Sequence, residues 1–480
     1  MNHRMIQFIL SRVLLAEAVL LAGSACVGLL YGESVLLTFG VPVALLLACA
    51  AVMWCFKPRS HNFYARDGMV AVSLAWILMS AFGALPFWLS GYMPSYVDCF
   101  FETVSGFTTT GASVLPAVEH LPRGLLFWRS FTHWIGGMGV LVFLMAIIPL
   151  AGDRSMHLMR AESPGPSVGK LVPRARTSAL ILYGMYCALT IAQIIFLLAG
   201  GMPLFDSVVH TFGTAGTGGF SIKNTSIMAY NSPYAEIVIT VFMLLFGVNF
   251  SLYYLVLVRR PLEALKSEEL QWYLGFFAAV TLLIAFNIRD MYDSFATALR
   301  HAAFQTSSII TTTGYATTDF NLWPEFSHAL IILVMIVGAC AGSTGGGFKV
   351  SRVVILVKSI RREVYRMLHP RAVAHIKFEG KSLDTEIVHG VLVYLGLYVI
   401  IAMVSVLLVA LDGYDHTTTV TAVLSALNNV GPGLGEVGPM GNYGLFSAVS
   451  KLVLSADMLI GRLEIIPLIV LCTPSVWRRR

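Results

Sequence analysis

Long apolar stretches alternate with short polar connections along almost the whole chain. A helix that crosses a bilayer needs about 20 mostly apolar residues, and ten stretches reach this length. They cover residues 10–31, 35–56, 68–90, 124–150, 177–200, 233–258, 268–288, 325–348, 387–411 and 443–472. The pattern predicts an all-α polytopic membrane protein with ten transmembrane helices.

Four connections between these stretches differ from ordinary polar loops. Each begins with a semi-apolar segment too short to cross a membrane, and the four segments read CFFETVSGFTT, LFDSVVHTFGT, SFATALRHAAFQTSSII and DHTTTVTAVLSAL. Each segment leads into a glycine-bearing pentad: TTGAS (109–113), GTGGF (216–220), TTGYA (312–316) and NVGPG (429–433). The central glycines are taken as Gly111, Gly218, Gly314 and Gly431, which lie 107, 96 and 117 residues apart. This recurrence predicts four repeats of helix, half-helix, pentad and helix.

The repeats divide the chain into five parts. Residues 1–56 form an additional N-terminal helix pair outside the repeats. The four repeats are then expected over residues 57–152, 153–266, 267–381 and 382–480. We expect them to surround one central pore with pseudo-fourfold symmetry.

The pentads have the composition of an ion filter. Irregular backbone survives at membrane depth only where protein buries it or where it lines a watery path. Glycine permits tight turns, a ring of carbonyls can replace the water shell of a bare cation, and the partly negative C-terminal end of a half-helix favours a cation. Close helix packing explains a single pentad as well, but four pentads at one spacing favour a filter. The expected filter residues are Thr109, Thr110, Gly111, Thr217, Gly218, Thr312, Thr313, Gly314, Asn429, Val430 and Gly431.

Composition and charge support a membrane location. Of the 480 residues, 57% are hydrophobic and 12% are charged, and the mean hydropathy is +0.76, whereas soluble domains carry about 25% charged residues. Lys and Arg gather on alternate connections, near residues 4–12, 57–66, 154–176, 259–266, 349–381 and 478–480. By the positive-inside rule both termini are cytoplasmic. The first apolar stretch resembles a signal peptide, but we interpret it as an uncleaved first helix because further apolar stretches follow at once.

Other kinds of chemistry have little support in the sequence. The seven cysteines are scattered without metal-binding spacing. The acidic residues are dispersed, so the sequence favours a transporter and not a membrane enzyme. The segment GSTGGGFK places Phe348 where a phosphate loop needs lysine, and no strand precedes it. We therefore expect no nucleotide site, no organic cofactor and no nucleic-acid partner.

The glycine-rich segment 338–352, GACAGSTGGGFKVSR, interrupts the helix that follows the third pentad. Three consecutive glycines should break a helix. One interpretation is a packing face formed by Gly342 and Gly346; the other is a flexible loop below the filter that opens or blocks the path. The expected gating residues are Gly342, Ser343, Thr344, Gly345, Gly346, Gly347 and Lys349.

Arg462 lies deep in the last apolar stretch, where a charge is costly and normally faces a partner or a wet cavity. It either forms a structural ion pair with Asp457 or Glu464, or raises a barrier to cations below the filter. Lys451 in the same stretch either pairs with Asp457 or reaches a half-helix.

Other polar residues on or near the half-helices have two interpretations each. Glu102, Asp206 and His210 either line the outer mouth of the pore or serve as helix caps and packing groups. His133 is expected to be a buried histidine whose hydrogen bonds are satisfied.

The four pentads, the loop at 338–349 and Arg462 together resemble the Trk/Ktr/HKT superfamily of potassium transporters, over essentially the whole chain. The additional N-terminal helix pair makes the chain most similar to the bacterial TrkH branch. The resemblance implies potassium uptake across the bacterial cytoplasmic (inner) membrane, with selectivity for K+ because position 111 is glycine and relatives with serine there favour sodium. In the second pentad, Thr217 departs from the usual apolar residue before Gly-Gly-Phe.

The resemblance also implies the loop's gating role, with Arg462 as the positive barrier. The implied partners are membrane lipid, a second copy of the chain in a homodimer, and a cytoplasmic nucleotide-binding regulatory subunit of TrkA type. The transported K+ is the only ion expected. A symporter that couples potassium to H+ or Na+ in the same pore remains the alternative.

Overall fold

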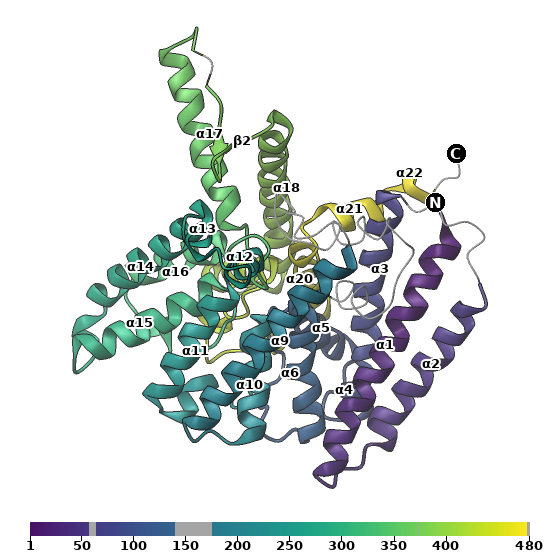
Figure 1. Cartoon of the computed structure of the whole chain (residues 1–480). Coiled ribbons are helices and arrows are strands. Elements are labelled where there is room, and N and C mark those ends of the chain that lie inside the picture. The colour runs from purple at the N-terminus through teal and green to yellow at the C-terminus, as the bar shows by residue number, and fades with distance from the viewer. Residues whose placement is uncertain (57–63, 140–174, 373, 478–480) are drawn as a thin grey trace.

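The computed structural model describes residues 1–56, 64–139, 175–372 and 374–477 (Figure 1). Within these ranges the chain is helical apart from one two-stranded antiparallel sheet, formed by β1 (Lys377–Phe378) and β2 (Lys381–Ser382). The expected basic connection at 478–480, most of those at 57–66 and 154–176, and the end of the fourth apolar stretch lie outside the described residues.

The N-terminal part of the chain forms the additional helix pair and the helices of the first repeat. Its elements are α1 (His3–Leu30), the π-helix η1 (Leu36–Gly40), α2 (Val41–Trp54), α3 (Ala65–Gly83), α4 (Leu85–Leu89), α5 (Tyr96–Phe107) and α6 (Arg123–Gly137). Helix α1 packs against α2, α3 and α6. Its buried face, which includes Ile9, Leu14 and Leu21, therefore joins the helix pair to the rest of the protein.

The remaining helices follow in two groups. Residues 175–368 form α9 (Ala175–Ala199), α10 (Leu204–Gly216), α11 (Pro233–Phe246), α12 (Phe250–Leu257), α13 (Pro261–Leu265), α14 (Glu268–Asn287), α15 (Phe295–Ile310), α16 (Glu325–Val337) and α17 (Val350–Leu368). Residues 385–477 form α18 (Thr385–Val409), α19 (His416–Asn428), α20 (Ala448–Arg462), α21 (Ile466–Cys472) and α22 (Pro474–Trp477). Short 3-10 turns lie at Ser226–Tyr230, Arg289–Met291, Phe320–Leu322, Ala410–Asp412, Gly435–Val437 and Tyr443–Leu445. Helix α17 and the β1–β2 hairpin project from one end of the helical body (Figure 1).

The described residues contain six helices that are long and apolar enough to cross a membrane. These are His3–Leu30, Leu36–Trp54, Ala65–Leu89, Ala179–Ala199, Glu268–Asn287 and Thr385–Asp412, and α11 with α12 makes a seventh if the bent pair counts as one span. Large apolar side chains on their outer faces are exposed, for example Ile400, Met403 and Leu407 on α18. Such a continuous apolar surface fits contact with lipid.

Three of the ten expected spans are interrupted. Helices α11 and α12 meet at an angle of 91°, where Gly247 ends one helix and Asn249 caps the next. Helix α16 ends at Val337, before the glycine-rich segment. The last stretch breaks between α20 and α21, where Glu464 and Ile465 have positive φ and Pro467 lies in the first turn of the new helix. The break at the glycine-rich segment was expected from the sequence, whereas the other two breaks were not.

Candidate ion filter and gating loop

The four short helices α5, α10, α15 and α19 end with the same backbone geometry. One residue just beyond the end of each helix has a left-handed conformation. Its φ is 56° at Thr109, 56° at Thr217, 57° at Thr312 and 56° at Asn429. The amide of each left-handed residue donates to the carbonyl three residues before it. The amide of the following residue donates to the carbonyl five residues before it: Thr110 N to Ser105 O (2.8 Å), Gly218 N to Gly213 O (2.8 Å), Thr313 N to Ser308 O (2.7 Å) and Val430 N to Ser425 O (2.9 Å). This is the Schellman arrangement that closes a helix end.

Threonine is an unusual choice for this left-handed position. A β-branched residue with positive φ is a genuine outlier, and each costs about 1–2 kcal/mol relative to an unstrained backbone. The side chains of Thr109, Thr217 and Thr312 are fully buried. Neighbouring structure therefore imposes the conformation, which aligns the carbonyl groups that follow.

The second segment aligns one residue later than the sequence analysis expected. Two residues beyond each left-handed position lies a glycine with positive φ: 81° at Gly111, 73° at Gly219, 82° at Gly314 and 102° at Gly431. The counterpart of Gly111 is therefore Gly219, and the assignment of Gly218 as the central glycine is wrong. Gly218 instead corresponds to Thr110, Thr313 and Val430. Aligning Thr217 with Thr109, and Ser221 with Ser113, would have revealed this register.

The four glycines and four carbonyl groups meet in a closed order. A Cβ at Gly111 would lie 1.9 Å from Gly218 O, and one at Gly219 would lie 1.9 Å from Thr313 O. A Cβ at Gly314 would lie 2.3 Å from Val430 O, and one at Gly431 would lie 2.6 Å from Thr110 O. The first filter segment thus contacts the second, the second contacts the third, the third contacts the fourth, and the fourth contacts the first. Only glycine fits at these four positions without displacing the neighbouring segment.

A cavity of about 150 Å³ adjoins one end of the ring. Its lining includes all four glycines and the residues that follow them, such as Ala112, Ser221, Ala316 and Pro432. Its volume has room for several water molecules. A hydrated ion can therefore approach the ring from this side.

The glycine-rich loop contacts the residues that precede the ring. Gly346 N donates to Thr312 Oγ1 (2.7 Å), and Gly347 N donates to Asn428 O (3.0 Å). A Cβ at Gly346 would lie 2.4 Å from Asn428 O. Lys349 is buried and donates from Nζ to Gly345 O. The cavity and the loop therefore lie at opposite ends of the filter segments.

Gly342 and Gly346 do not form one packing face. Gly342 lies against the side chain of Asn249, whereas Gly346 lies against the end of α19. Ser343 Oγ donates back to Cys340 O (2.6 Å) and thereby shapes the turn. These contacts are those of an irregular loop whose two ends meet different helices.

Arg462 joins this loop to α6. Its Nη1 donates to Thr344 O (2.8 Å), and its Nη2 donates to Gly136 O (2.6 Å) and Gly137 O (2.8 Å). The two acids considered from sequence have other partners, since Glu464 pairs with Arg352 and Asp457 accepts from Ser405 Oγ (2.7 Å). Lys451 reaches Asp98 on α5 at 2.6 Å, so the half-helix alternative for this lysine is confirmed.

Glu269 on α14 also holds the loop and was missed from sequence. Its Oε1 accepts from Ala341 N (2.7 Å), and the group is buried. Gly247 O accepts from Cys340 N, and Gly342 O accepts from Phe250 N, so the break between α11 and α12 fits against the loop. The sequence did not indicate a role for Glu269 in holding the loop, because an acidic residue in the first turn of a helix is common.

The polar residues on the half-helices have partners within the protein. Asp206 accepts from Tyr230 (2.7 Å), and His210 Nε2 lies 3.0 Å from Ser221 Oγ. Glu102 pairs with Arg129, a residue that the sequence analysis did not single out, and the His133 ring contacts the second segment. In the part of the chain that the structure describes, no group of three or more His, Cys, Asp or Glu side chains could hold a metal ion. The oxygens that lie against the ring glycines are the backbone carbonyls of Thr110, Gly218, Thr313 and Val430.

Comparisons with known proteins identify the family of the chain. The family described as "TrkH: Cation transport protein" matches residues 39–288 and 288–478. The Trk system potassium uptake protein TrkH of Salmonella typhimurium is 37% identical, with 94% of each chain covered, and that of Vibrio parahaemolyticus is 37% identical, with 100% of each chain covered. The crystal structure of the potassium transporter TrkH from Vibrio parahaemolyticus superposes with a TM-score of 0.90 and 35% identity, covering both chains completely. This chain therefore belongs to the TrkH family of cation transport proteins.

Proposed function

We propose that this protein takes up potassium ions across the cytoplasmic membrane through a gated, channel-like pore. The observation that carries this proposal is the closed order of contacts among the four glycines and the carbonyl oxygens of Thr110, Gly218, Thr313 and Val430. The relatives named above are potassium uptake proteins, which agrees with potassium as the ion.

The chemistry of the filter follows from its oxygens. Carbonyls held at fixed positions replace the water around a dehydrated cation, and the C-terminal ends of α5, α10, α15 and α19 add partial negative charge. The proposed filter residues are Thr109, Thr110, Gly111, Thr217, Gly218, Gly219, Thr312, Thr313, Gly314, Asn429, Val430 and Gly431. The ion is substrate, and the pore needs no organic cofactor.

The membrane arrangement that fits this function has ten crossings and four repeats. Six continuous spans are joined by three interrupted ones and by α6, whose continuation is not among the described residues. The repeats at 57–152, 153–266, 267–381 and 382–480 would each supply one filter segment. Both termini would be cytoplasmic, with the cavity of about 150 Å³ on the outer side.

We assign gating to the loop and to Arg462. In the described conformation Gly346 and Gly347 bond to the base of two filter segments. The guanidinium of Arg462 bonds to the same loop and places a positive charge below the filter. Release of the loop would open the path, and Gly342, Ser343, Thr344, Gly345 and Lys349 would move with it.

A cytoplasmic partner would act on this gate. The projecting α17 carries basic residues and continues directly from the loop (Figure 1). The relatives are named as components of a Trk system, which fits a nucleotide-binding TrkA-type regulator. A homodimer within the lipid is the expected assembly.

Purified protein in liposomes tests the proposal. A potassium gradient should drive a current that reverses near the potassium equilibrium potential, because the filter excludes sodium. Protein-free vesicles serve as the control. The absence of potassium flux from folded protein would remove the proposed function, and a reversal potential that moves with pH or sodium would favour the coupled symporter.

Replacing Arg462 by glutamine should raise potassium flux roughly tenfold, because three charge-assisted hydrogen bonds of about 1.5–3 kcal/mol each are lost or weakened. The potassium-to-sodium permeability ratio should stay unchanged, since the ring itself is untouched. Steady-state flux in liposomes measures the effect. Arg289→Gln, at an exposed arginine, is the matched control. Unchanged flux in folded Arg462→Gln protein would contradict the role given to Arg462.

A further inference from the structure

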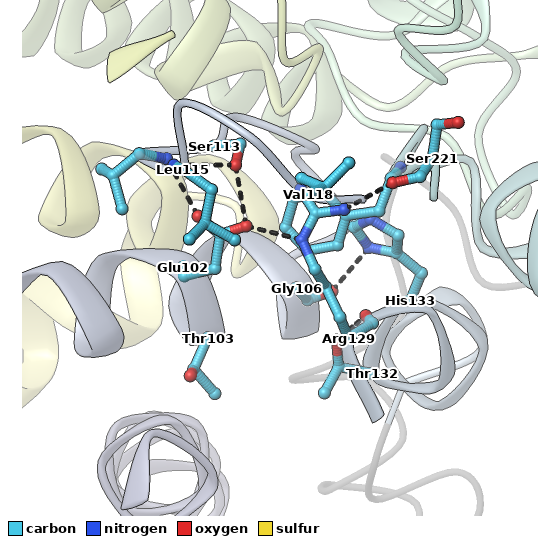
Figure 2. A network of polar contacts seen from close by, with 12 residues as sticks. Glu102, Thr103, Gly106, Ser113, Leu115, Val118, Arg129, Thr132, His133 and Ser221 are labelled. Carbon is cyan, nitrogen blue, oxygen red and sulfur yellow. Dashed lines mark hydrogen bonds and ion pairs between the residues drawn. The ribbon is translucent and has the colours of Figure 1, made fainter. Parts of the chain in front are cut away.

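A buried ion pair lies beside the joint between the first and second filter segments. Arg129 Nε on α6 is 2.6 Å from Glu102 Oε1 on α5, and the two side chains are 4% and 0% exposed. Figure 2 shows the pair at the centre of a network that extends to both segments. Burying two charges is costly unless further hydrogen bonds satisfy them. The groups that make these further hydrogen bonds show which parts of the chain the pair holds in place.

Glu102 holds the chain that leaves the first segment. Its Oε1 accepts from Ser113 Oγ (2.9 Å), and its Oε2 accepts from Val114 N (2.9 Å). Ser113 lies two residues beyond the ring glycine Gly111. The carboxylate therefore fixes the return path of the first segment relative to the helix that carries it.

Arg129 holds the chain that leaves the second segment. Its Nη1 donates to Ser221 O (3.0 Å), and its Cζ lies 3.5 Å from the centre of the Phe220 ring. Phe220 directly follows the ring glycine Gly219. The guanidinium thus grips the second segment through a hydrogen bond and a cation–π contact, while its own charge is paired with Glu102.

His133, one helical turn beyond Arg129, adds a second tie at the same joint. Its Nδ1 lies 2.8 Å from Gly106 O, and its Nε2 lies 3.2 Å from Phe220 N. Because a carbonyl only accepts and an amide only donates, the ring is neutral with its proton on Nδ1. This neutral contact keeps α5 and Phe220 close but has none of the charge of the ion pair.

The other three joints are held differently. Tyr315 donates to His210 O between segments two and three (2.9 Å). Asn321 exchanges hydrogen bonds with Gly435 between three and four, and Asn429 donates to Thr110 Oγ1 between four and one (3.0 Å). These three ties are neutral hydrogen bonds. Ion pairs also join neighbouring repeats at Arg300–Glu236 and Lys451–Asp98, but the hydrogen bonds of the Glu102–Arg129 pair reach the chain just beyond two ring glycines.

We propose that Glu102 and Arg129 are positioning residues that set the ion selectivity of the filter by fixing the separation of its first two segments. The inference rests on the proposed potassium filter. Arg129 lines the outer cavity with the four ring glycines, so its positive charge would repel an entering cation without Glu102. The pair therefore combines a rigid clamp with local neutrality.

Single and double substitutions separate these two effects. Arg129→Gln and Glu102→Gln should each lower the potassium-to-sodium permeability ratio about tenfold, the factor that corresponds to ~1.4 kcal/mol. At low potassium, Glu102→Gln should also lower conductance because it leaves Arg129 unpaired, whereas Arg129→Gln should not. The double variant should recover conductance but not selectivity. Reversal potentials and currents of purified protein in liposomes give both quantities.

Arg300→Gln is the matched control, because Arg300 forms another ion pair with Glu236 (2.8 Å) on α15 and α11. It should retain the wild-type permeability ratio. Arg129→Lys keeps the charge but shortens the reach to Ser221 O, and it replaces Arg129→Gln if that variant does not fold; its ratio should also fall. A wild-type ratio in the folded Arg129 variants, or an equal loss in Arg300→Gln, would overturn the inference. Absence of selective potassium flux in the unmodified protein would instead count against the proposed function.

Discussion

Serine in place of Gly111 is expected to lower the potassium-to-sodium permeability ratio roughly tenfold or more, a change of at least ~1.4 kcal/mol in relative ion stabilisation. The residue has φ of 81°, and a Cβ there would lie 1.9 Å from Gly218 O. The second segment must move to admit the side chain, so its carbonyl leaves the position that suits a potassium ion. Reversal potentials under mixed potassium and sodium gradients measure the ratio.

Two companion variants show whether the ring is responsible. Gly219→Ser should have the same effect, because its Cβ would lie 1.9 Å from Thr313 O. Gly201→Ser has a similar backbone cost, with φ of 85°, but its Cβ meets nothing within 4 Å, so selectivity should be retained. A selective Gly111→Ser protein would argue against the filter, and a selective Gly219→Ser protein would argue against the corrected register.

Deletion of Gly345–Gly347 is expected to raise steady potassium flux roughly tenfold while the permeability ratio is kept. The deletion removes the amides that bond to Thr312 Oγ1 and Asn428 O. Two hydrogen bonds of about 0.5–1.5 kcal/mol each are then lost from the closed arrangement, and the shortened loop no longer lies below the ring. Single-channel or flux recordings in liposomes measure open probability and selectivity together.

Thr312→Val gives a milder test of the same contact. Valine keeps the branched shape but cannot accept the hydrogen bond from Gly346, so flux should rise several-fold and less than in the deletion. Normal gating with altered ion preference in either variant would contradict the assignment of the loop to gating.

The sequence predicted the parts of the site that recur. The four half-helices and their glycine segments were recognised because the same residue types return after about a hundred positions, and the structure brings these segments together. The register of the second segment was missed because GTGGF offers two glycines, and the left-handed φ of Thr217 with the positive φ of Gly219 distinguishes them. A recurring pattern thus identifies the filter segments more reliably than it shows which residue of one segment corresponds to which residue of another.

Contacts that occur once could not be predicted in this way. Arg129 and Glu269 act on backbone that is distant in sequence, at Ser221 and Ala341 respectively. The break at Gly247 lies in a stretch that is apolar enough to count as one span, and the charged residues of the last stretch do not indicate that the helix breaks at Glu464. Hydropathy reports the environment of a stretch and not its direction, so these features require coordinates.

All four edges of the ring belong to one polypeptide, and they are not chemically identical: three left-handed positions hold threonine and the fourth holds Asn429, whose amide reaches Thr110. In an assembly of four separate identical subunits, any inherited change at such a position would appear four times at once. Here a single codon alters one quarter of the circle and leaves the other three as they were. Ion preference in this architecture can therefore change by small steps during evolution.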